Sequence, residues 1–230
     1  MSVTKPAVVL VNLGTPDAPT TAAVRRYLKQ FLSDPRVVEA PRLIWFWVLR
    51  LIILPLRPRR VAKLYASIWQ QDAPIRLVAQ QQAEALAGRF DCTVRYAMSY
   101  GSPGFEAVLD ELADQGHDHL LILPLYPQYS GSTNGAVADA LARWVRTRRE
   151  VPGLTLVKDY WQNPAWLDAV ADSIRRFREQ HGEAEKLLFS FHGIPVSYQD
   201  KGDHYGERCH HSAALIAELL GLRADQWMVT

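Results

Sequence analysis

Short apolar runs alternate along this chain with longer stretches in which apolar residues recur every three or four positions. The short runs predict strands over residues 7–12, 92–98, 119–123, 154–157 and 187–191, with a further strand beginning at Trp227. The periodic stretches predict helices over residues 21–32, 59–69, 74–87, 105–115, 135–148, 164–180 and 207–220. Strands that alternate with helices are typical of a parallel sheet with helices on both faces, so we expect an α/β fold.

The strand predicted over residues 187–191 ends directly before His192, and Gly193 and Pro195 then break the regular backbone. In an open α/β sheet, ligands bind outside the carboxyl ends of the strands, which is where this histidine is expected. An imidazole in that place can ligate a metal ion or transfer a proton near neutral pH. The alternative is a histidine that only hydrogen-bonds a neighbouring carbonyl group.

The other predicted strand ends carry aromatic and hydroxyl side chains with few charges. These segments are LGTP at residues 13–16, SYGS at 99–102 and LYPQYS at 125–130. With His192 they would line one crevice of a parallel sheet, and their composition suits a broad apolar ligand held by a few polar contacts. The first segment has only Gly14, with neither a GxGxxG nor a Walker sequence, so we exclude a phosphate-binding loop.

The most apolar stretch of the chain, RLIWFWVLRLIILPL, runs from Arg42 to Leu56 and is interrupted internally only by Arg50. A bilayer span needs about 18 or more apolar residues, so this stretch is short for one. A helix that is apolar on all sides is usually buried, which is one interpretation. Aromatic and aliphatic residues flanked by arginines are also typical of a segment that lies on a membrane surface, and we favour this second interpretation.

The composition is that of an ordinary soluble globular protein, with 48% hydrophobic and 22% charged residues among 230. A net charge of +2 is too small to indicate nucleic-acid binding. Cys92 and Cys209 form no metal-binding cluster and fit a reducing compartment.

A Pro-Gly turn before the strand at residue 154 predicts one domain over residues 1–155 and a second over 156–230. The second has few strands, and the one at Trp227 has only begun, so we expect this domain to be incomplete.

Three segments of the chain resemble the ferrochelatases, the enzymes that insert ferrous iron into protoporphyrin. They are LVNLGTPDAP near the N-terminus, LPLYPQYSGSTNGA in the middle, and SFHGIPVSYQDKGDHY followed by Cys209. The resemblance extends from Ala7 to Thr230 and is to bacterial members of the family. It implies a chelatase fold of two Rossmann-like halves, with helices on both faces of each parallel sheet and the porphyrin in a cleft between the halves.

The resemblance also implies roles for individual residues. His192 matches the family's active-site histidine, which ligates iron, accepts a pyrrole proton, or does both. Leu13 matches a residue on the opposite face of the porphyrin, although a leucine cannot ligate the metal. The stretch from Arg42 to Leu56 matches the hydrophobic lip that guards the cleft and rests on the membrane. The residues expected to contact the porphyrin are Leu13, Arg57, Arg60, Tyr65, Arg95, Tyr96, Tyr126 and Ser130.

The implied activity is that of a lyase-type metallochelatase, which inserts Fe(II) into protoporphyrin IX to give protohaem in the last step of haem biosynthesis. Iron is then a substrate, no permanently bound cofactor is expected, and the protein is expected in the cytoplasm, bound peripherally to the inner membrane face. Family members continue beyond Thr230 with an acidic residue, usually Glu, that faces the histidine as a second metal ligand. We therefore expect a chain ending at Thr230 to bind porphyrin weakly and to metallate it poorly or not at all.

Two alternatives belong beside this interpretation. A cobalt or nickel tetrapyrrole chelatase would share the fold, and it would insert cobalt into sirohydrochlorin but no iron into protoporphyrin. A non-catalytic porphyrin-binding fragment on the membrane surface would shift the absorbance of porphyrin without converting it to haem.

Overall fold

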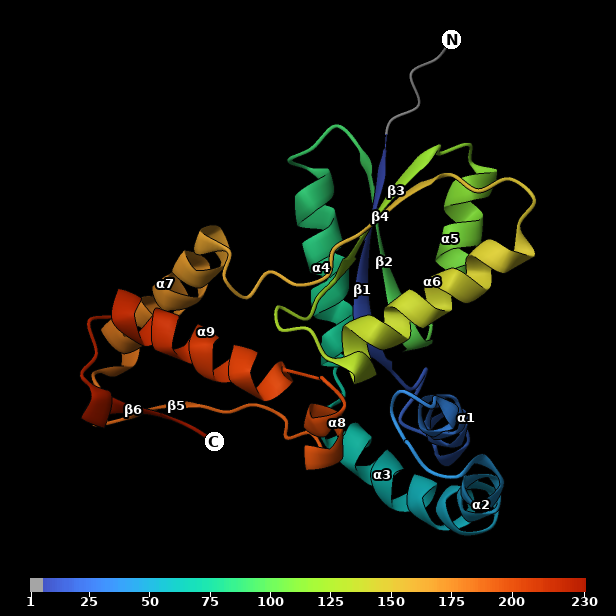
Figure 1. Cartoon of the computed structure of the whole chain (residues 1–230), viewed down its shortest axis with the longest axis horizontal. Helices are drawn as coiled ribbons and strands as arrows, with labels where there is room; N and C mark the ends of the chain where they lie inside the picture. Colours follow the sequence, from blue (N-terminus) through green and yellow to red (C-terminus); the bar gives the residue numbers. More distant parts are fainter. Residues whose placement is uncertain (1–5) are drawn as a thin grey trace. The chain divides into compact units, whose positions relative to one another are not determined.

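Figure 1 shows the computed structural model of the chain, in which residues 6–230 are described. The chain divides into two compact units. The first comprises Met1–Tyr126 and Gly131–Val157, and the second comprises Pro127–Ser130 and Lys158–Thr230. The four residues Pro127–Ser130 therefore belong to the second unit, although in the sequence they lie within the first.

The first unit is built on a four-stranded parallel sheet in the order β2-β1-β3-β4. Its strands are β1 (Ala7–Thr15), β2 (Thr93–Gly101), β3 (His119–Pro124) and β4 (Gly153–Leu156). The central strand β1 has buried apolar residues on both faces, as expected for a parallel sheet covered by helices on both sides. The α/β fold predicted from the alternation of strands and helices is confirmed.

Helices cover both faces of this sheet, with α4 on one face and α5 and α6 on the other (Figure 1). Their bounds are α4 (Pro74–Ala87), α5 (Phe105–Asp114) and α6 (Ala136–Thr147). On the side of α5 and α6, Val9 and Val11 of β1 belong to a fully buried cluster that includes Trp144. On the side of α4, Leu10 packs with Ala83. Successive residues of β1 thus face opposite helices, and this alternation fixes the register of the strand.

A long helical segment follows α1 (Thr21–Ser33) in the chain. It comprises α2 (Arg42–Val48), the π-helical turn η1 (Leu49–Ile53) and α3 (Leu54–Ile68). The sequence predicted the last of these helices only from residue 59. It begins earlier because Pro55 lies in its first turn, where the missing N–H group is tolerated. Among residues 6–230, the structure contains no helix with the length and apolar character needed to span a bilayer.

Strands β1 and β2 both extend further than the sequence predicted, through Gly14 and Gly101. Both glycines adopt positive φ angles, 104° and 91°, within the paired region where Gly14 lies opposite Tyr100. An added Cβ at Gly14 would lie 1.7 Å from the Tyr100 carbonyl oxygen. Glycine is required here because the two backbones approach too closely for any side chain.

The second unit contains four helices, α7 to α9 and η3, and two strands within the described residues. They are α7 (Pro164–His181), β5 (Leu187–Phe189), α8 (Val196–Asp200), α9 (Tyr205–Leu219), η3 (Ala224–Gln226) and β6 (Trp227–Val229). The strands β5 and β6 pair in parallel, which confirms the strand predicted at Trp227. The core lies between this pair and the helices α7 and α9, and Phe189 packs there with Leu167 and Ile216.

Two expectations about this unit were wrong. Strand β5 has three residues rather than five. Its Leu188 is 57% exposed, so burial on both faces does not explain the apolar sequence of this strand. Helix α8 was not predicted, because its short sequence VSYQD carries no repeating apolar positions.

Candidate active site

At the carboxyl ends of β1, β2 and β3 the first unit holds three buried hydroxyl groups, on Thr15, Ser99 and Tyr126. In the described part of the chain none of the three has a partner at normal hydrogen-bond geometry, although the Ser99 and Tyr126 hydroxyls lie close to each other. A buried hydroxyl without a partner costs roughly 1–3 kcal/mol, so native proteins seldom keep several together. Three of them at one edge of a parallel sheet mark a place where a ligand or water supplies the missing partners.

Tyrosine side chains surround the same edge of the sheet. Tyr27 of α1 packs edge-on against Tyr65 of α3, with ring centroids 6.3 Å apart, and its hydroxyl donates to the Gly14 carbonyl at 3.4 Å. Burial raises the pKa of Tyr27, Tyr65 and Tyr126 above the usual value of a phenol. These phenols therefore stay protonated at physiological pH, and the edge presents neutral, aromatic surface.

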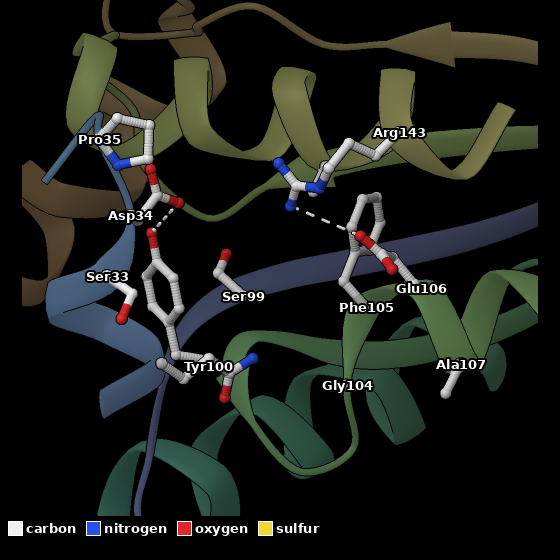
Figure 2. A pocket seen from close by; sticks show the side chains of 12 residues that line it. Ser33, Asp34, Pro35, Ser99, Tyr100, Gly104, Phe105, Glu106, Ala107 and Arg143 are labelled. Atoms are coloured by element: carbon white, nitrogen blue, oxygen red, sulfur yellow. Dashed lines mark hydrogen bonds and ion pairs between the residues drawn. The ribbon is translucent and has the colours of Figure 1, made fainter. Parts of the chain in front are cut away.

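A pocket of about 430 Å³ adjoins the end of β2. Figure 2 shows the side chains that line it. The Tyr100 hydroxyl donates to the Asp34 carboxylate at 2.8 Å, and burial raises the pKa of this tyrosine as well. On the other side of the pocket, Arg143 and Glu106 form an ion pair at 3.5 Å. Ser99 also lines this pocket, so the pocket meets the cluster of unpartnered hydroxyls at that residue.

The structure does not bring Arg95 and Tyr96 to this edge. They lie in the middle of β2, opposite Val9 and Leu10 of β1. Arg95 is exposed and its Nε lies 3.5 Å from the Glu111 carboxylate of α5, while Tyr96 packs against the α4 side of the sheet. Substrate contact by these two residues is therefore not supported.

The residues that occupy the end of β2 are Ser99 and Tyr100, which the sequence placed in a loop lining the expected crevice but not among the individual substrate contacts. The signal that could have identified them is the sequence Gly101-Ser102-Pro103, because a glycine and a proline mark where regular backbone ends.

The remaining predicted residues of this unit fall into two groups. Leu13 lies half-buried at the end of β1, and Tyr65 and Tyr126 lie close to Tyr27 beside it. Arg57 and Arg60 are exposed on α3, three positions apart and therefore on neighbouring parts of one helix face. The structure thus gathers Leu13, Tyr65 and Tyr126 at the sheet edge, and leaves the two arginines exposed to solvent.

In the second unit, His192 is exposed and follows β5 by three positions. Its imidazole makes no hydrogen bond or ion pair with any of residues 6–230, so it does not serve as a bridge to a neighbouring carbonyl group. Its backbone lies close to the Tyr205 hydroxyl, which also lies close to the Cys209 thiol. The fold therefore holds the main chain of His192 and leaves its side chain open for chemistry.

The PQYS part of the LYPQYS segment packs against the beginning of α9. The Ser130 hydroxyl donates to Asp203 Oδ2 at 2.8 Å, and Gln128 donates to the Ser212 hydroxyl at 2.9 Å. The Arg208 guanidinium donates to the Tyr129 carbonyl at 3.0 Å and lies 5.3 Å from the centre of the Tyr129 ring. Ser130 is only 2% exposed, so its hydroxyl faces Asp203 and not an open binding surface.

Asp203 connects this segment to the backbone of His192. One of its carboxylate oxygens accepts the Ser130 hydroxyl, and the other accepts the backbone N–H of Tyr205 at 3.1 Å. Tyr205 is the first residue of α9, and its hydroxyl lies close to the backbone of His192. We infer that Ser130 and Asp203 position the histidine rather than touch the substrate.

We predict that replacing Asp203 by alanine lowers the free energy of unfolding of the protein by about 1–3 kcal/mol, because two partners of a carboxylate are lost. Urea denaturation followed by circular dichroism measures this change. NMR of the imidazole protons should show the His192 signals shifted or broadened. The control is Asp200→Ala on the exposed side of α8; equal stability of the two variants would contradict the positioning role.

The fold and the site define a class of α/β protein with its polar and aromatic residues at the carboxyl ends of parallel strands and a free histidine after the strand of a second unit. Comparison with known proteins identifies the family: the chain matches the Ferrochelatase model over residues 5–230 and belongs to the ferrochelatase family. It is 53% identical over 231 residues to a ferrochelatase of Psychrobacter sp., and 50% and 47% identical over 233 residues to ferrochelatases of Acinetobacter baumannii and Acinetobacter baylyi.

These alignments cover 97–98% of this chain and 68–69% of the relatives. The resemblance predicted from the LYPQYS and SFHGIP segments is confirmed. A chelatase-type fold agrees with the parallel sheet and its flanking helices.

Proposed function

We propose that this chain acts as a ferrochelatase, inserting ferrous iron into protoporphyrin IX to give protohaem in the last step of haem biosynthesis. The observation that supports this most directly is membership of the ferrochelatase family together with a histidine whose imidazole is exposed and unpaired within residues 6–230. We further propose that residues 1–155 and 156–230 supply the two functional halves of the enzyme.

Metal insertion requires the removal of two pyrrole protons and of the water bound to the ion. A neutral imidazole accepts a proton near neutral pH and is also a ligand that Fe(II) takes readily, so we assign both tasks to His192. Among the described residues, no group of three or more His, Cys, Asp or Glu could hold a metal ion.

The first unit supplies the proposed contacts to the porphyrin. Neutral phenols of Tyr65 and Tyr126, both half-buried, present a surface that an apolar ring can cover without the cost of burying a charge, while the buried Tyr27 packs behind Tyr65. Leu13 contributes only dispersion contacts, because it has no group that can ligate a metal. Exposed guanidinium groups at Arg57 and Arg60 suit the two propionate carboxylates, with which arginine forms paired hydrogen bonds.

The direct test is turnover by the purified chain. Anaerobic incubation with protoporphyrin IX and Fe(II) should give the absorbance spectrum of haem when the chain is joined to the part of the Psychrobacter relative outside the alignment, and little haem with the chain by itself. Cobalt insertion into sirohydrochlorin with no iron insertion would identify a different chelatase. A shift of the porphyrin spectrum on binding, without haem, would indicate a binding function only.

We also propose that the lip, defined as the segment from Arg42 to Leu56, rests on the cytoplasmic face of the membrane. Leu43, Leu51 and Leu56 are 74%, 65% and 70% exposed, and Trp47 is exposed as well. Exposed apolar patches of this kind mark surfaces that contact a partner or a membrane. Only Leu49 and Leu54 of the segment are buried, so the interpretation as a helix of the core is not supported.

The lip predicts how the protein binds vesicles. Replacing Leu43 and Trp47 by serine should lower the affinity for phosphatidylcholine vesicles at least about tenfold, because each position loses its apolar contact with the membrane. Co-sedimentation with the vesicles measures this affinity. Trp45 is a less suitable target, since its Nε1 donates to the Leu32 carbonyl at 2.6 Å and the residue fixes α2 to α1. The control is Phe90→Ser, an equally exposed aromatic residue outside the lip. Unchanged sedimentation of the lip variant would contradict the proposal.

A further inference from the structure

A small basic recess lies where the lip meets the end of α1. Its volume is about 160 Å³, and three cationic side chains line it: Lys29 from α1, Arg42 from α2 and Arg50 from η1. The other lining residues are Ser33, Trp45, Phe46 and Leu49. No acidic side chain is among them, so the recess carries a net positive charge.

The recess is built from residues with defined contacts rather than from loose surface chains. The Trp45 indole bonds the Leu32 carbonyl at 2.6 Å, which fixes the first turn of α2 against the end of α1. The Arg50 guanidinium lies 4.2 Å from the centre of the Phe46 ring and is held there by a cation–π contact. The Ser33 hydroxyl donates to the Lys29 carbonyl at 2.5 Å and satisfies one of the free carbonyl groups at the end of α1.

The charges in the recess are not neutralised by the protein. Within residues 6–230, neither Lys29 nor Arg42 nor Arg50 forms an ion pair with a carboxylate. By contrast, other arginines on the surface of the first unit are paired, such as Arg36 with Asp139 at 2.7 Å and Arg148 with Asp110 at 2.8 Å. Three cations without a carboxylate partner thus line one cavity, where a single anion can approach all of them.

We propose that this recess binds the phosphate group of an anionic membrane lipid. This inference rests on the proposed membrane association of the lip and adds the partner that gives it lipid selectivity. The exposed apolar residues Leu43, Phe46 and Trp47 lie on the same short helix as Arg42, so a phosphate in the recess would sit at headgroup level while they enter the acyl region. Arginine binds phosphate oxygens in pairs, and lysine adds a point charge.

Free phosphate has the same chemistry, but the position of the recess beside the lip favours the lipid. The apolar contact of the lip is insensitive to salt, whereas attraction between the recess and an anionic headgroup is screened by salt. Binding should therefore have two separable parts, one present on neutral vesicles and one that requires anionic lipid.

The experiment measures co-sedimentation of the whole chain with phosphatidylcholine vesicles, with and without phosphatidylglycerol, for Arg42→Gln/Arg50→Gln and for the control Arg25→Gln/Arg89→Gln. The control removes the same charge from exposed positions outside the recess. Each basic side chain at an anionic surface raises affinity roughly fivefold, so the recess variant should lose about thirtyfold on anionic vesicles, with little change on neutral ones. Arg42→Lys/Arg50→Lys should retain most of the binding, because the charge is kept.

An equal loss in the recess and control variants would reduce the effect to overall charge and overturn the proposal. The proposal would also be overturned if inorganic phosphate shifted the NMR signals of the recess residues while the protein bound anionic vesicles no more tightly than neutral ones. The Leu43 and Trp47 variant could lose binding to neutral vesicles while the recess variant still prefers anionic vesicles. This result would support the lip proposal and contradict the recess proposal. If no vesicle binds the unaltered chain, the membrane proposal itself fails.

Discussion

Replacing His192 by alanine is expected to lower the rate of iron insertion by at least about a hundredfold, because the variant loses the group that accepts the pyrrole proton. Binding of protoporphyrin should persist, since the neutral aromatic residues of the first unit are unchanged. Haem formation measured by absorbance gives the rate, and quenching of porphyrin fluorescence gives the affinity. Measuring both separates a catalytic loss from a loss of binding.

The matched control is His210→Ala, which removes another exposed imidazole from the second unit. This variant should retain the activity of the unaltered chain. Both substitutions, His192→Ala and His210→Ala, are also made in a chimera that has a measurable rate. The chimera joins this chain to the part of the Psychrobacter ferrochelatase that lies outside the alignment. Equal turnover of the two variants would show that His192 has no part in the reaction.

Replacing Gly14 by alanine is expected to lower the free energy of unfolding by at least about 3 kcal/mol, a large share of the 5–15 kcal/mol that stabilises a typical domain. The added Cβ would meet the Tyr100 carbonyl oxygen at 1.7 Å, and the φ angle of 104° is one that side chains rarely allow. The β1–β2 pairing would have to separate at the edge that carries the site. Thermal and urea denaturation followed by circular dichroism measure the change.

Gly116 offers a control that separates the two causes. It also has a positive φ angle, 84°, but nothing lies within 4 Å of an added Cβ. Gly116→Ala should therefore cost only about 1–2 kcal/mol, the price of the backbone conformation alone. If both variants lose the same stability, close approach of the strands is not what requires glycine at Gly14.

The α/β fold could be predicted from the sequence because the spacing of apolar residues along the chain follows from which side of each helix or strand is buried. β1 is apolar at successive positions since helices cover both faces, and α6 repeats its apolar residues because one side faces the sheet. The ends of the strands could not be predicted in the same way. Glycine usually ends a strand, but Gly14 and Gly101 continue the pairing with positive φ angles, which no local pattern reveals.

The difference in strand length also bears on the candidate site. A strand β2 that ends at residue 98 places Ser99 and Tyr100 in a loop, whereas in the structure both belong to the strand. Arg95 and Tyr96, which only the family resemblance indicated, lie in its middle. Position along the strand decides which residues reach the carboxyl edge, and the hydrogen-bonded register is needed to determine it. His192 could be predicted as a candidate because a histidine directly after an apolar run and before Gly-Ile-Pro is visible in the sequence alone.

The membership of Pro127–Ser130 in the second unit has a practical consequence for anyone who divides this protein. The polypeptide leaves the first unit after Tyr126, returns at Gly131 and leaves again after Val157, so the second unit is not specified by one uninterrupted stretch of gene. A fragment beginning at Lys158 would lack the partners of Asp203, Arg208 and Ser212. Exchange of this unit between relatives must therefore transfer four codons from the middle of its neighbour as well.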